Sequence, residues 1–415
     1  MSETHRGRRL HVVILGDYLG FPHGMANTGR ALLMARALQE AGVAVRVLAL
    51  QGIDRAPEAL NTQARGVHMG IPFEYACGTA LRHESFVVRR LIAMRGWLSG
   101  GLRLLRLRRQ GVLDLVILWF WTPRPALRLF FFTALLRLMR VPVVREVNES
   151  PWSQKPDASA LERLWSPLAW TAGALTISRE LHEWAVHAYR RRPDARVIDV
   201  PILVDVDERA PVAYPAESLA TTPLLVFAAS PAYRSIVEFI FAAMHEVWRR
   251  HPECRLVVTG AASGDPRADW LRSEVQQSGL QGRVDLVGYL DRSDLLDLYV
   301  RAHALLIPLF DDRQSRARFP TKIGEYLAAA RPVVTSSVGE IPLYLTDGVD
   351  AVLCPPDDAL AYGQAIVNLL DDPVRAADIG RLGRRVAETR FHYGLFGERL
   401  AEAFSKLGGC IARAR

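Results

Sequence analysis

The sequence predicts an α/β protein built from two doubly wound parallel-sheet domains. Short apolar runs of strand length alternate with longer segments of helical periodicity along most of the chain. A segment rich in Pro, Asp and Glu interrupts this alternation soon after residue 200, and the same pattern then starts again. The chain has 415 residues, which is too long for one ordinary core and fits two domains.

The first domain is expected over residues 1–203. It opens with the apolar run "RLHVVILGDYLG", a glycine-containing loop, a helix that Gly42 ends, and a second buried strand, "VAVRVLAL". Strand, helix and strand at this spacing form a βαβ unit, which implies a parallel sheet. Four later runs are also expected to be strands: "LDLVILWF", "VPVVREV", "GALTIS" and "ARVIDVP".

A linker is expected over residues 204–222, and the second domain over residues 223–390. A C-terminal helix, residues 391–415, is expected to cross back to the first domain. Ligands of doubly wound sheets bind beyond the carboxyl ends of the strands, so the cleft between two facing domains is the expected site. The expected strands of the second domain are "LLVFAAS", "CRLVVTG", "RVDLVGYL", "AHALLIPL", "RPVVTSS" and "DAVLCPP".

The composition indicates a folded cytoplasmic protein. Half of the residues are hydrophobic and 23% are charged, which is typical of globular chains rather than disordered ones. The four cysteines show no paired spacing, which argues against a disulfide framework or a zinc site and fits a reducing cytosol. We recognise no signal peptide, and no run reaches the roughly 18 apolar residues that a membrane-spanning helix needs.

Positive charge is concentrated in the first half of the chain. The net charge is +12 over the first 200 residues and −4 over the rest. The segment from Leu81 to Gln110 holds eight arginines and one acidic residue, Glu84, with apolar residues between the arginines at roughly helical spacing. We interpret it as an attachment site for an anionic membrane surface, at about 1 kcal/mol per basic residue, and expect a peripheral location on the inner membrane face.

Two alternatives remain for this basic segment. It can form two solvated helices whose leucine faces pack on the sheet. It can also bind nucleic acid, but it contains no recognised binding motif, so we expect no nucleic-acid partner.

A lysine in the second half occupies an unusual place. The chain has only three lysines, and Lys322 follows Pro320, where a helix is expected to begin with Thr321 as its cap. A cation at a helix N-terminus is unfavourable by a few tenths of a kcal/mol up to about 1 kcal/mol. The position is explained if an anion such as a phosphate binds there.

Glu325 lies three residues after Lys322, so the two side chains are neighbours on the first turn. A carboxylate at this place can accept hydrogen bonds from two hydroxyls, such as those of a ribose. The alternative is a surface Lys–Glu pair worth about 0.3 kcal/mol. The scarcity of lysine in this chain favours a functional role.

The stretch from Arg318 to Val334, "RFPTKIGEYLAAARPVV", resembles the signature "P-x-K-x-x-E-Y-L-A-x-G-x-P-V-V" of retaining glycosyltransferase family 4, among the group 1 glycosyl transferases. Ala330 stands where that signature has Gly. Further stretches resemble the family in the same order along the chain, from "FPHGMANTGRALLMARALQEAGVAVRVL" to "GEIPLYLTDGVDAVLCPPDDALAYGQAIVNLLDD". The resemblance implies the GT-B fold, in which two Rossmann-like domains face each other across a cleft.

The resemblance also implies roles for individual residues in binding a nucleotide-sugar donor. Glu325 would hold the ribose, and Gly24 would let the first domain approach the phosphates closely, because it has no Cβ. The pair Gly288–Tyr289 would lie beside the base. Two segments would lie along the diphosphate and the sugar. They are the loop from Phe319 through Pro320 and Thr321 to Gly324, and the turn formed by Val338, Gly339 and Glu340.

Two departures from the family pattern concern the catalytic charges. The family often has a second Glu eight residues before the ribose-binding one, where this chain has Ala317; Ser315 or Arg318 would then contact the donor sugar. The family also often has Arg and Lys five residues apart after the first strand of the second domain, where this chain has Ala229 and Arg234. Lys322 and Arg234 would then be the two cations that stabilise the diphosphate leaving group.

The resemblance places the acceptor side at the loop that contains Asn148 and Glu149; the alternative is that these are ordinary polar loop residues. His23, in the first loop, is a further candidate for contact with the acceptor, and the alternative is that it is merely exposed. The Asp205–Asp207 pair falls in the expected linker, so no metal and no cofactor are expected.

The leading hypothesis is a retaining glycosyltransferase that acts on a glycan or lipid-linked acceptor in surface polysaccharide biosynthesis. The alternatives are a non-catalytic GT-B-like subunit that binds glycan or a partner, and a nucleotide-sugar epimerase. The base, the sugar, the acceptor and the oligomeric state are not determined by the sequence.

Overall fold

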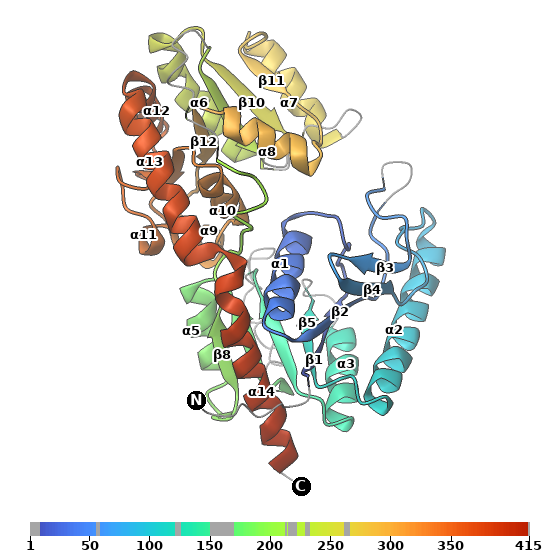
Figure 1. Ribbon diagram of the computed structural model, residues 1–415. Helices are drawn as coiled ribbons and strands as arrows, with labels where there is room; N and C mark the ends of the chain where they lie inside the picture. Colours follow the sequence, from blue (N-terminus) through green and yellow to red (C-terminus); the bar gives the residue numbers. More distant parts are fainter. Residues whose placement is uncertain are drawn as a thin grey trace, which may run out of the picture. The chain divides into compact units, whose positions relative to one another are not determined.

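The computed structural model in Figure 1 describes residues 9–54, 59–120, 126–149, 170–211, 214, 222–228, 233–260 and 266–413. The chain divides into two compact units. The N-terminal unit comprises Met1–Leu203 together with Tyr393–Arg415, and the C-terminal unit comprises Val204–His392. The segment that we expected to be a separate linker, residues 204–222, is grouped with the C-terminal unit from Val204 onward.

The N-terminal unit has one sheet, whose described strands follow the order β3-β4-β2-β1-β5-β6-β7-β8. All neighbouring pairs are parallel except β3 and β4, which pair antiparallel at one edge. The sequence analysis did not recognise this short β3–β4 hairpin. The strands are β1 (His11–Gly16), β2 (Ala44–Ala49), β3 (Arg65–His68), β4 (Ile71–Tyr75), β5 (Leu115–Trp119), β6 (Val143–Val147), β7 (Gly173–Thr176) and β8 (Arg196–Asp199).

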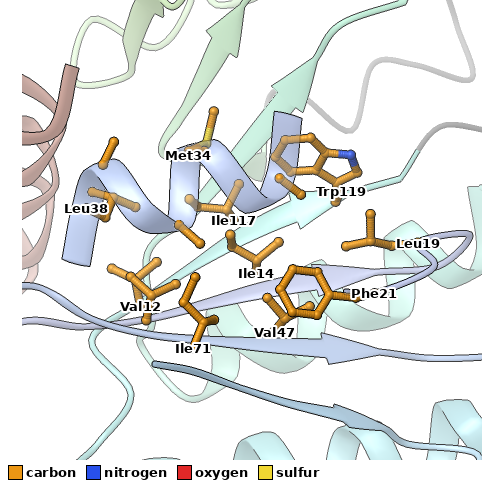
Figure 2. Close-up of a cluster of buried hydrophobic side chains, with 14 of the residues drawn as sticks. Val12, Ile14, Leu19, Phe21, Met34, Leu38, Val47, Ile71, Ile117 and Trp119 are labelled. Carbon is orange, nitrogen blue, oxygen red and sulfur yellow. The ribbon is translucent and has the colours of Figure 1, made fainter. Parts of the chain in front are cut away.

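The core of this unit forms between the sheet and helix α1 (Ala26–Glu40). Figure 2 shows Met34 and Leu38 of α1 packed over Ile14 of β1 and Ile117 of β5. All four side chains are fully buried, and burial of a side chain of this size stabilises the fold by about 1.5–3 kcal/mol. The other described α-helices of the unit are α2 (Phe86–Arg109), α3 (Ala126–Leu138), α5 (Arg179–Ala188) and α14 (Gly397–Arg413).

A buried ion pair connects α1 to the sheet. Arg30 Nε lies 2.7 Å from Glu146 Oε1 at the end of β6, and both side chains are 1% exposed. The same guanidinium donates hydrogen bonds to the carbonyls of Val200 and Pro201, which follow β8. Loss of one partner would leave an uncompensated buried charge, at a cost of about 3–5 kcal/mol.

Helix α2 packs on the sheet with its small residues. Gly96 and Gly100 face Leu50, and a Cβ on Gly96 would collide with the Leu50 carbonyl. Leu104 of α2 is fully buried in the core, whereas Leu91, Leu98 and Leu102 are more than half exposed. The alternative of two solvated helices is wrong in the number of helices, because Phe86–Arg109 forms a single helix. In the described part of the chain, no helix is both long enough and apolar enough to span a bilayer.

The C-terminal unit has a second sheet, whose described strands follow the order β11-β10-β9-β12-β13-β14 and pair in parallel throughout. Helices α6 (Arg234–Arg250) and α12 (Ala359–Asp371) pack against each other and bury apolar faces in this unit's core. The strands are β9 (Leu224–Ala228), β10 (Arg255–Thr259), β11 (Val284–Leu286), β12 (Ala304–Ile307), β13 (Val333–Ser336) and β14 (Val352–Cys354). The remaining described helices are α7 (Pro266–Gln277), α8 (Arg292–Arg301), α9 (Arg313–Ala317), α10 (Thr321–Ala328), α11 (Ile341–Tyr344), α13 (Pro373–Val386) and the π-helical turn η3 (Ala387–Phe391).

The C-terminal helix α14 lies against α1 of the N-terminal unit (Figure 1). Tyr393, just before α14, donates a 2.5 Å hydrogen bond to Glu40 of α1 and accepts one from Arg36. Gly397 begins α14 in direct contact with α1, where a Cβ would collide with the carbonyl oxygen of Ala37. The two helices can pack this closely only because residue 397 has no side chain.

This contact gives a test of how α14 is held. We expect Gly397→Ala to lower the free energy of unfolding by about 1–3 kcal/mol, as overpacking usually does. Gly29→Ala, in α1, is the matched control, because no atom lies within 4 Å of the added Cβ and alanine is the better helix former. The control should keep or raise the melting temperature. Equal melting temperatures for the two variants would contradict the packing argument.

Candidate functional site

The sequence-predicted donor residues of the C-terminal unit gather at one edge of its sheet. Arg234 follows β9, the loop before α10 follows β12, and the turn at Gly339 follows β13. These three strands are neighbours and run in the same direction, so their carboxyl ends meet at a common edge. Gly288 and Tyr289 follow β11 at the same edge. Ligands of open α/β sheets bind at this edge.

Helix α10 begins at Thr321, with Pro320 as its N-cap. The expectation that Thr321 caps the helix is wrong, because Thr321 is the first helical residue and no side chain makes a capping hydrogen bond there. The first-turn N–H groups of α10 are therefore not satisfied by a capping side chain, which is the condition for binding an anion.

Glu325 lies on this helix between two cations. Its Oε2 is 3.0 Å from Lys322 Nζ, and its Oε1 is 3.1 Å from Arg292 Nη1. The Glu325 side chain is 18% exposed. Burial by itself raises the pKa of Glu325, but the charges and hydrogen bonds of Lys322 and Arg292 outweigh it, so the pKa lies below its usual value. Glu325 is therefore an ionised, partly accessible acceptor.

The Lys322 side chain lies along α10 toward Glu325 rather than beyond the N-terminus of the helix. Its Nζ also donates a 3.0 Å hydrogen bond to Tyr299 Oη of α8. Burial, with the charge of Glu325, raises the pKa of Tyr299 well above its usual range, so this hydroxyl stays protonated. The Lys322–Glu325 pair expected from the spacing is present, and it is partly buried rather than a surface pair.

Arg292 is the residue of this site that the sequence analysis missed. It is the first residue of α8, and it binds Glu208 with two hydrogen bonds of 2.8 and 2.7 Å in addition to its contact with Glu325. Glu208 lies only a few residues after the chain enters the C-terminal unit. No local pattern indicates this contact, because the three residues come from distant parts of the sequence.

The loop before α10 is fixed by aromatic packing. The Phe319 ring stacks on Tyr344 at 5.3 Å and meets the edge of Phe391 at 5.5 Å, so its side chain belongs to the core. Gly339 has φ 57°, and a Cβ there would come within 2.9 Å of the Arg316 carbonyl oxygen. Both the left-handed backbone and the close contact require glycine, and Glu340 beside it is buried.

The remaining donor-side residues are more open. Arg234 is at the start of α6 with 63% of its side chain exposed, and it pairs with Glu238 at 2.7 Å. Tyr289 is 57% exposed. Ser315 and Arg318 are the two candidates to replace the glutamate that this chain lacks. Ser315 is buried. The Arg318 guanidinium lies 5.6 Å from the ring of Tyr233, the residue before Arg234 in the sequence.

Two alanines stand where the family pattern often has Glu and Arg. Ala317 is fully buried. Ala229 lies outside the described residues.

The predicted acceptor-side residues lie in the N-terminal unit. The His23 ring is 5.3 Å from that of His68, and burial, with the charge of His23, lowers the pKa of His68. Asn148 donates a 3.5 Å hydrogen bond to Asn27, which also accepts one from the Trp119 indole. These contacts add Asn27 and Trp119 to the polar residues near the carboxyl ends of β5 and β6, and they place His68 of β3 against the loop that follows β1.

Gly24 and Glu149 complete the N-terminal predictions. A Cβ on Gly24 would collide with the Thr28 hydroxyl, which is hydrogen-bonded to the Gly20 carbonyl at 2.6 Å, so glycine is required by the fold of the loop itself. Glu149 is partly buried, and the residues after it, 150–169, lie outside the described part of the chain.

The Asp205–Asp207 pair has a third neighbour that the sequence did not indicate. Ligand atoms of Asp205, Asp207 and His392 lie within 4.8 Å of one another. Exposed carboxylates often gather in this way without a metal, so we assign no ion to them.

Comparison with known proteins identifies the C-terminal unit. Residues 222–372 match the family model described as Glycosyl transferases group 1. Over this range the chain is similar to the group 1 glycosyl transferases. All of the predicted donor residues except Gly24 fall within the matched range. The finer assignment to family 4 stays a prediction.

Related sequences support this assignment. The glycogen synthase of Mycobacterium tuberculosis (strain ATCC 25618 / H37Rv) is 28% identical over 169 residues, which cover 41% of this chain and 39% of that relative. The α-D-kanosaminyltransferase of Streptomyces kanamyceticus is 22% identical over 294 residues, covering 67% and 74% of the two chains. The chain thus spans about two fifths of the length of the glycogen synthase that it matches.

Solved structures show that the fold is GT-B. The sucrose-phosphate synthase of Thermosynechococcus elongatus superimposes with a TM-score of 0.73 at 17% identity, covering 96% of this chain and 100% of that one. Anabaena Alr3699/HepE in complex with UDP-glucose superimposes with a TM-score of 0.67 at 16% identity, covering 95% and 99%. The expected fold class is confirmed.

The charge state of Glu325 can be tested through stability. Its folded pKa is depressed, so its ion pairs stabilise the fold above the unfolded pKa of about 4.3 and are lost as the pH falls through the folded pKa. We expect Glu325→Gln to lower the free energy of unfolding at pH 7 by about 1.5–3 kcal/mol. Urea unfolding at pH 7, 5, 4 and 3.5 should show this difference shrinking below about pH 4.3. A difference that grows in acid would contradict the assignment.

Proposed function

We propose that this chain transfers a sugar from a nucleoside-diphosphate sugar to a glycan acceptor, with retention of configuration at the sugar. The observation that carries the proposal is the Glu325 carboxylate, held by two cations on the first turn of α10 at the carboxyl edge of the sheet. An ionised carboxylate in this place can accept hydrogen bonds from both hydroxyls of a ribose. Relatives in the same family are named as GDP-mannose-dependent mannosyltransferases, and the Anabaena neighbour was solved with UDP-glucose.

The same edge offers positive charge for the diphosphate. The N-terminus of α10 presents backbone N–H groups, and Arg234 and Arg318 lie after β9 and β12. When the bond to the sugar breaks, negative charge develops on the leaving diphosphate, and fixed cations stabilise it. These side chains supply the positive charge themselves, so we propose a reaction that needs no metal and no cofactor.

The strongest alternative is a non-catalytic GT-B-like subunit that binds glycan or a partner protein. Ala317 favours it, because this position is fully buried and carries no group that can touch a donor sugar. Arg318 favours catalysis instead, since its guanidinium lies 5.6 Å from the ring of Tyr233, just before α6, and so supplies a cation at the carboxyl edge of the sheet.

We also propose that helix α2 attaches the protein to an anionic membrane surface on the cytoplasmic side. Six apolar side chains of α2 are each more than half exposed. From Val87 onward they recur three to four residues apart, so they form one stripe along the helix. Exposed arginines flank and extend the stripe, and α3 beside it exposes more apolar residues. The stripe consists of Phe86, Val87, Leu91, Met94, Leu98 and Leu102.

An exposed apolar stripe bordered by arginines matches the interface of an anionic bilayer, where apolar side chains enter the acyl boundary and cations meet headgroups. Two relatives are named for phosphatidylinositol monomannoside acceptors, which are lipids. A lipid-linked glycan of a surface polysaccharide is therefore the acceptor class that we propose.

The catalytic proposal is tested with UDP-, GDP- and ADP-sugars and a lipid extract as the acceptor source. Acceptor-dependent release of free nucleotide supports transfer, binding without release supports the non-catalytic subunit, and epimerised sugar without transfer supports an epimerase. Lys322→Ala should lower turnover about ten- to a thousandfold, because a positive charge near the proposed diphosphate site is lost. It should also lower the melting temperature, because the partly buried pair with Glu325 is lost. Lys322→Arg should restore part of the rate.

Lys406→Ala is the matched control for Lys322→Ala. Lys406 forms an exposed pair with Glu402 in α14, so its loss should leave turnover unchanged. If Lys322→Ala and Lys406→Ala both transfer at the parent rate, Lys322 has no catalytic role.

The membrane proposal predicts co-sedimentation with vesicles that contain phosphatidylglycerol and not with neutral phosphatidylcholine vesicles. Replacing the exposed arginines of α2 with Gln should release the protein from the anionic vesicles, and added salt should weaken binding of the parent. The triple variant Leu91→Ser, Leu98→Ser, Leu102→Ser should also release it. The arginines to change are Arg90, Arg95, Arg106 and Arg109.

A control set of four exposed arginines in the C-terminal unit removes the same charge elsewhere and should leave vesicle binding unchanged: Arg249, Arg250, Arg301 and Arg381. A parent protein that binds neither vesicle, but forms a dimer that the leucine variants dissociate, would show that the stripe is a protein interface instead.

A further inference from the structure

We propose that Arg292 is a positioning residue for nucleotide binding, which holds the Glu325 carboxylate in the orientation that a ribose requires, and that Glu208 holds Arg292. The inference rests on the proposed function, because that function assigns the ribose to Glu325. The residues of this arrangement, Glu208, Arg292, Glu325 and Lys322, are called the carboxylate clamp below.

The Arg292 guanidinium joins two carboxylates in the clamp. Nε and Nη2 donate to the two oxygens of Glu208 at 2.8 and 2.7 Å, and Nη1 lies 3.1 Å from Glu325 Oε1. The planar fork binds Glu208 in a bidentate manner, so its own orientation is set by that contact. The bidentate contact therefore also fixes the direction of Nη1, and Nη1 in turn fixes the position of the Glu325 carboxylate.

Lysine alone cannot set this orientation. Lys322 Nζ binds Glu325 Oε2 at 3.0 Å, but it lies at the end of a flexible four-carbon side chain and is a point charge. With Arg292 on one oxygen and Lys322 on the other, the carboxylate plane is defined by two contacts. Without Arg292, Glu325 can follow the ammonium group to other rotamers, and the negative charge of Glu208 is no longer neutralised beside it.

The clamp leaves room for a ligand on Glu325. Oε1 of Glu325 contacts Arg292, Oε2 contacts Lys322, and the Tyr299 hydroxyl is also hydrogen-bonded to this carboxylate. A carboxylate has about four acceptor positions, so these three contacts do not use all of them. The side chain is 18% exposed, so the open positions can be reached from solvent.

Glu208 is itself anchored. The carbonyl of Val206 accepts a 3.0 Å hydrogen bond from Arg384 of α13, and the Val204 N–H donates a 2.9 Å hydrogen bond to the Phe391 carbonyl. The backbone that leads to Glu208 is thus bound to α13 and η3 independently of Glu325. Arg292 is held before any ligand arrives, and preorganisation of this kind lowers the entropic cost of binding.

The test measures ribose recognition separately from folding. Calorimetry gives the Kd of UDP, GDP and ADP, and the tightest of the three is compared with its 2′-deoxy and 3′-deoxy forms. The variants are Arg292→Gln, Arg292→Lys and Glu208→Gln. The matched control is Arg209→Gln, which breaks the ion pair of the residue after Glu208 with Asp297 of α8 but does not touch Glu325.

Arg292→Gln should weaken binding of the ribonucleotide about ten- to a hundredfold, the loss expected for a charge-assisted contact, and should bring the ratio of deoxy to ribo Kd towards one. Arg292→Lys should recover part of the affinity. Glu208→Gln, which leaves Arg292 in place, should shift the same ratio by a smaller factor, and it provides the test if Arg292→Gln does not fold. Arg209→Gln should leave the ratio unchanged even if it lowers the melting temperature.

Three outcomes would overturn the inference, and they are distinguishable. If the parent discriminates ribo from deoxy forms but Arg292→Gln and Glu208→Gln do so equally well, the clamp is structural only and the proposed function stands. If the parent binds a nucleotide but binds the deoxy forms as tightly, Glu325 does not hold the ribose. If the parent binds none of the three nucleotides, the proposed function fails together with the inference.

Discussion

The parallel direction of the strands is the constraint on which the candidate site depends. In the C-terminal unit the described strands all run the same way, so the segments that follow β9, β12 and β13 meet at one edge of the sheet. Arg234, the start of α10 and the turn at Gly339 are far apart in the chain and come together for this reason alone. Each segment begins just as a buried strand ends, so the core of the unit also determines where the polar groups stand.

Two ion-pair systems in this protein differ in what they leave open. Arg30 and Glu146 are both 1% exposed, and Arg30 also donates hydrogen bonds to two backbone carbonyls. This pair therefore connects α1 to the sheet and is closed to solvent. Glu325 is also held by cations, but its side chain is 18% exposed, so solvent can reach it. The first system is a structural contact, whereas the second is preorganised for binding.

Local patterns predicted much of the fold because they depend on neighbours in the chain. The apolar runs became β1, β2, β5 to β8 and the strands of the second sheet, since a strand buried on both faces needs apolar residues throughout. The β3–β4 hairpin was not predicted, because its edge strand β3 is half exposed and has no apolar run. For α2 the sequence left open whether the leucines pack on the sheet: Leu104 does, but the closest approach is made by Gly96 and Gly100.

By itself, the sequence determined the α/β alternation, the restart of the pattern after residue 203, and the meeting of Lys322 with Glu325, because residues three apart on a helix are neighbours in any fold. Only the tertiary structure decided that Arg292 completes the site. Its two carboxylate partners belong to other segments of the chain, and Glu208 is 84 residues away from it. Which side chains meet across such distances depends on how α8 and α10 pack on the sheet, and no periodicity in the sequence records that packing.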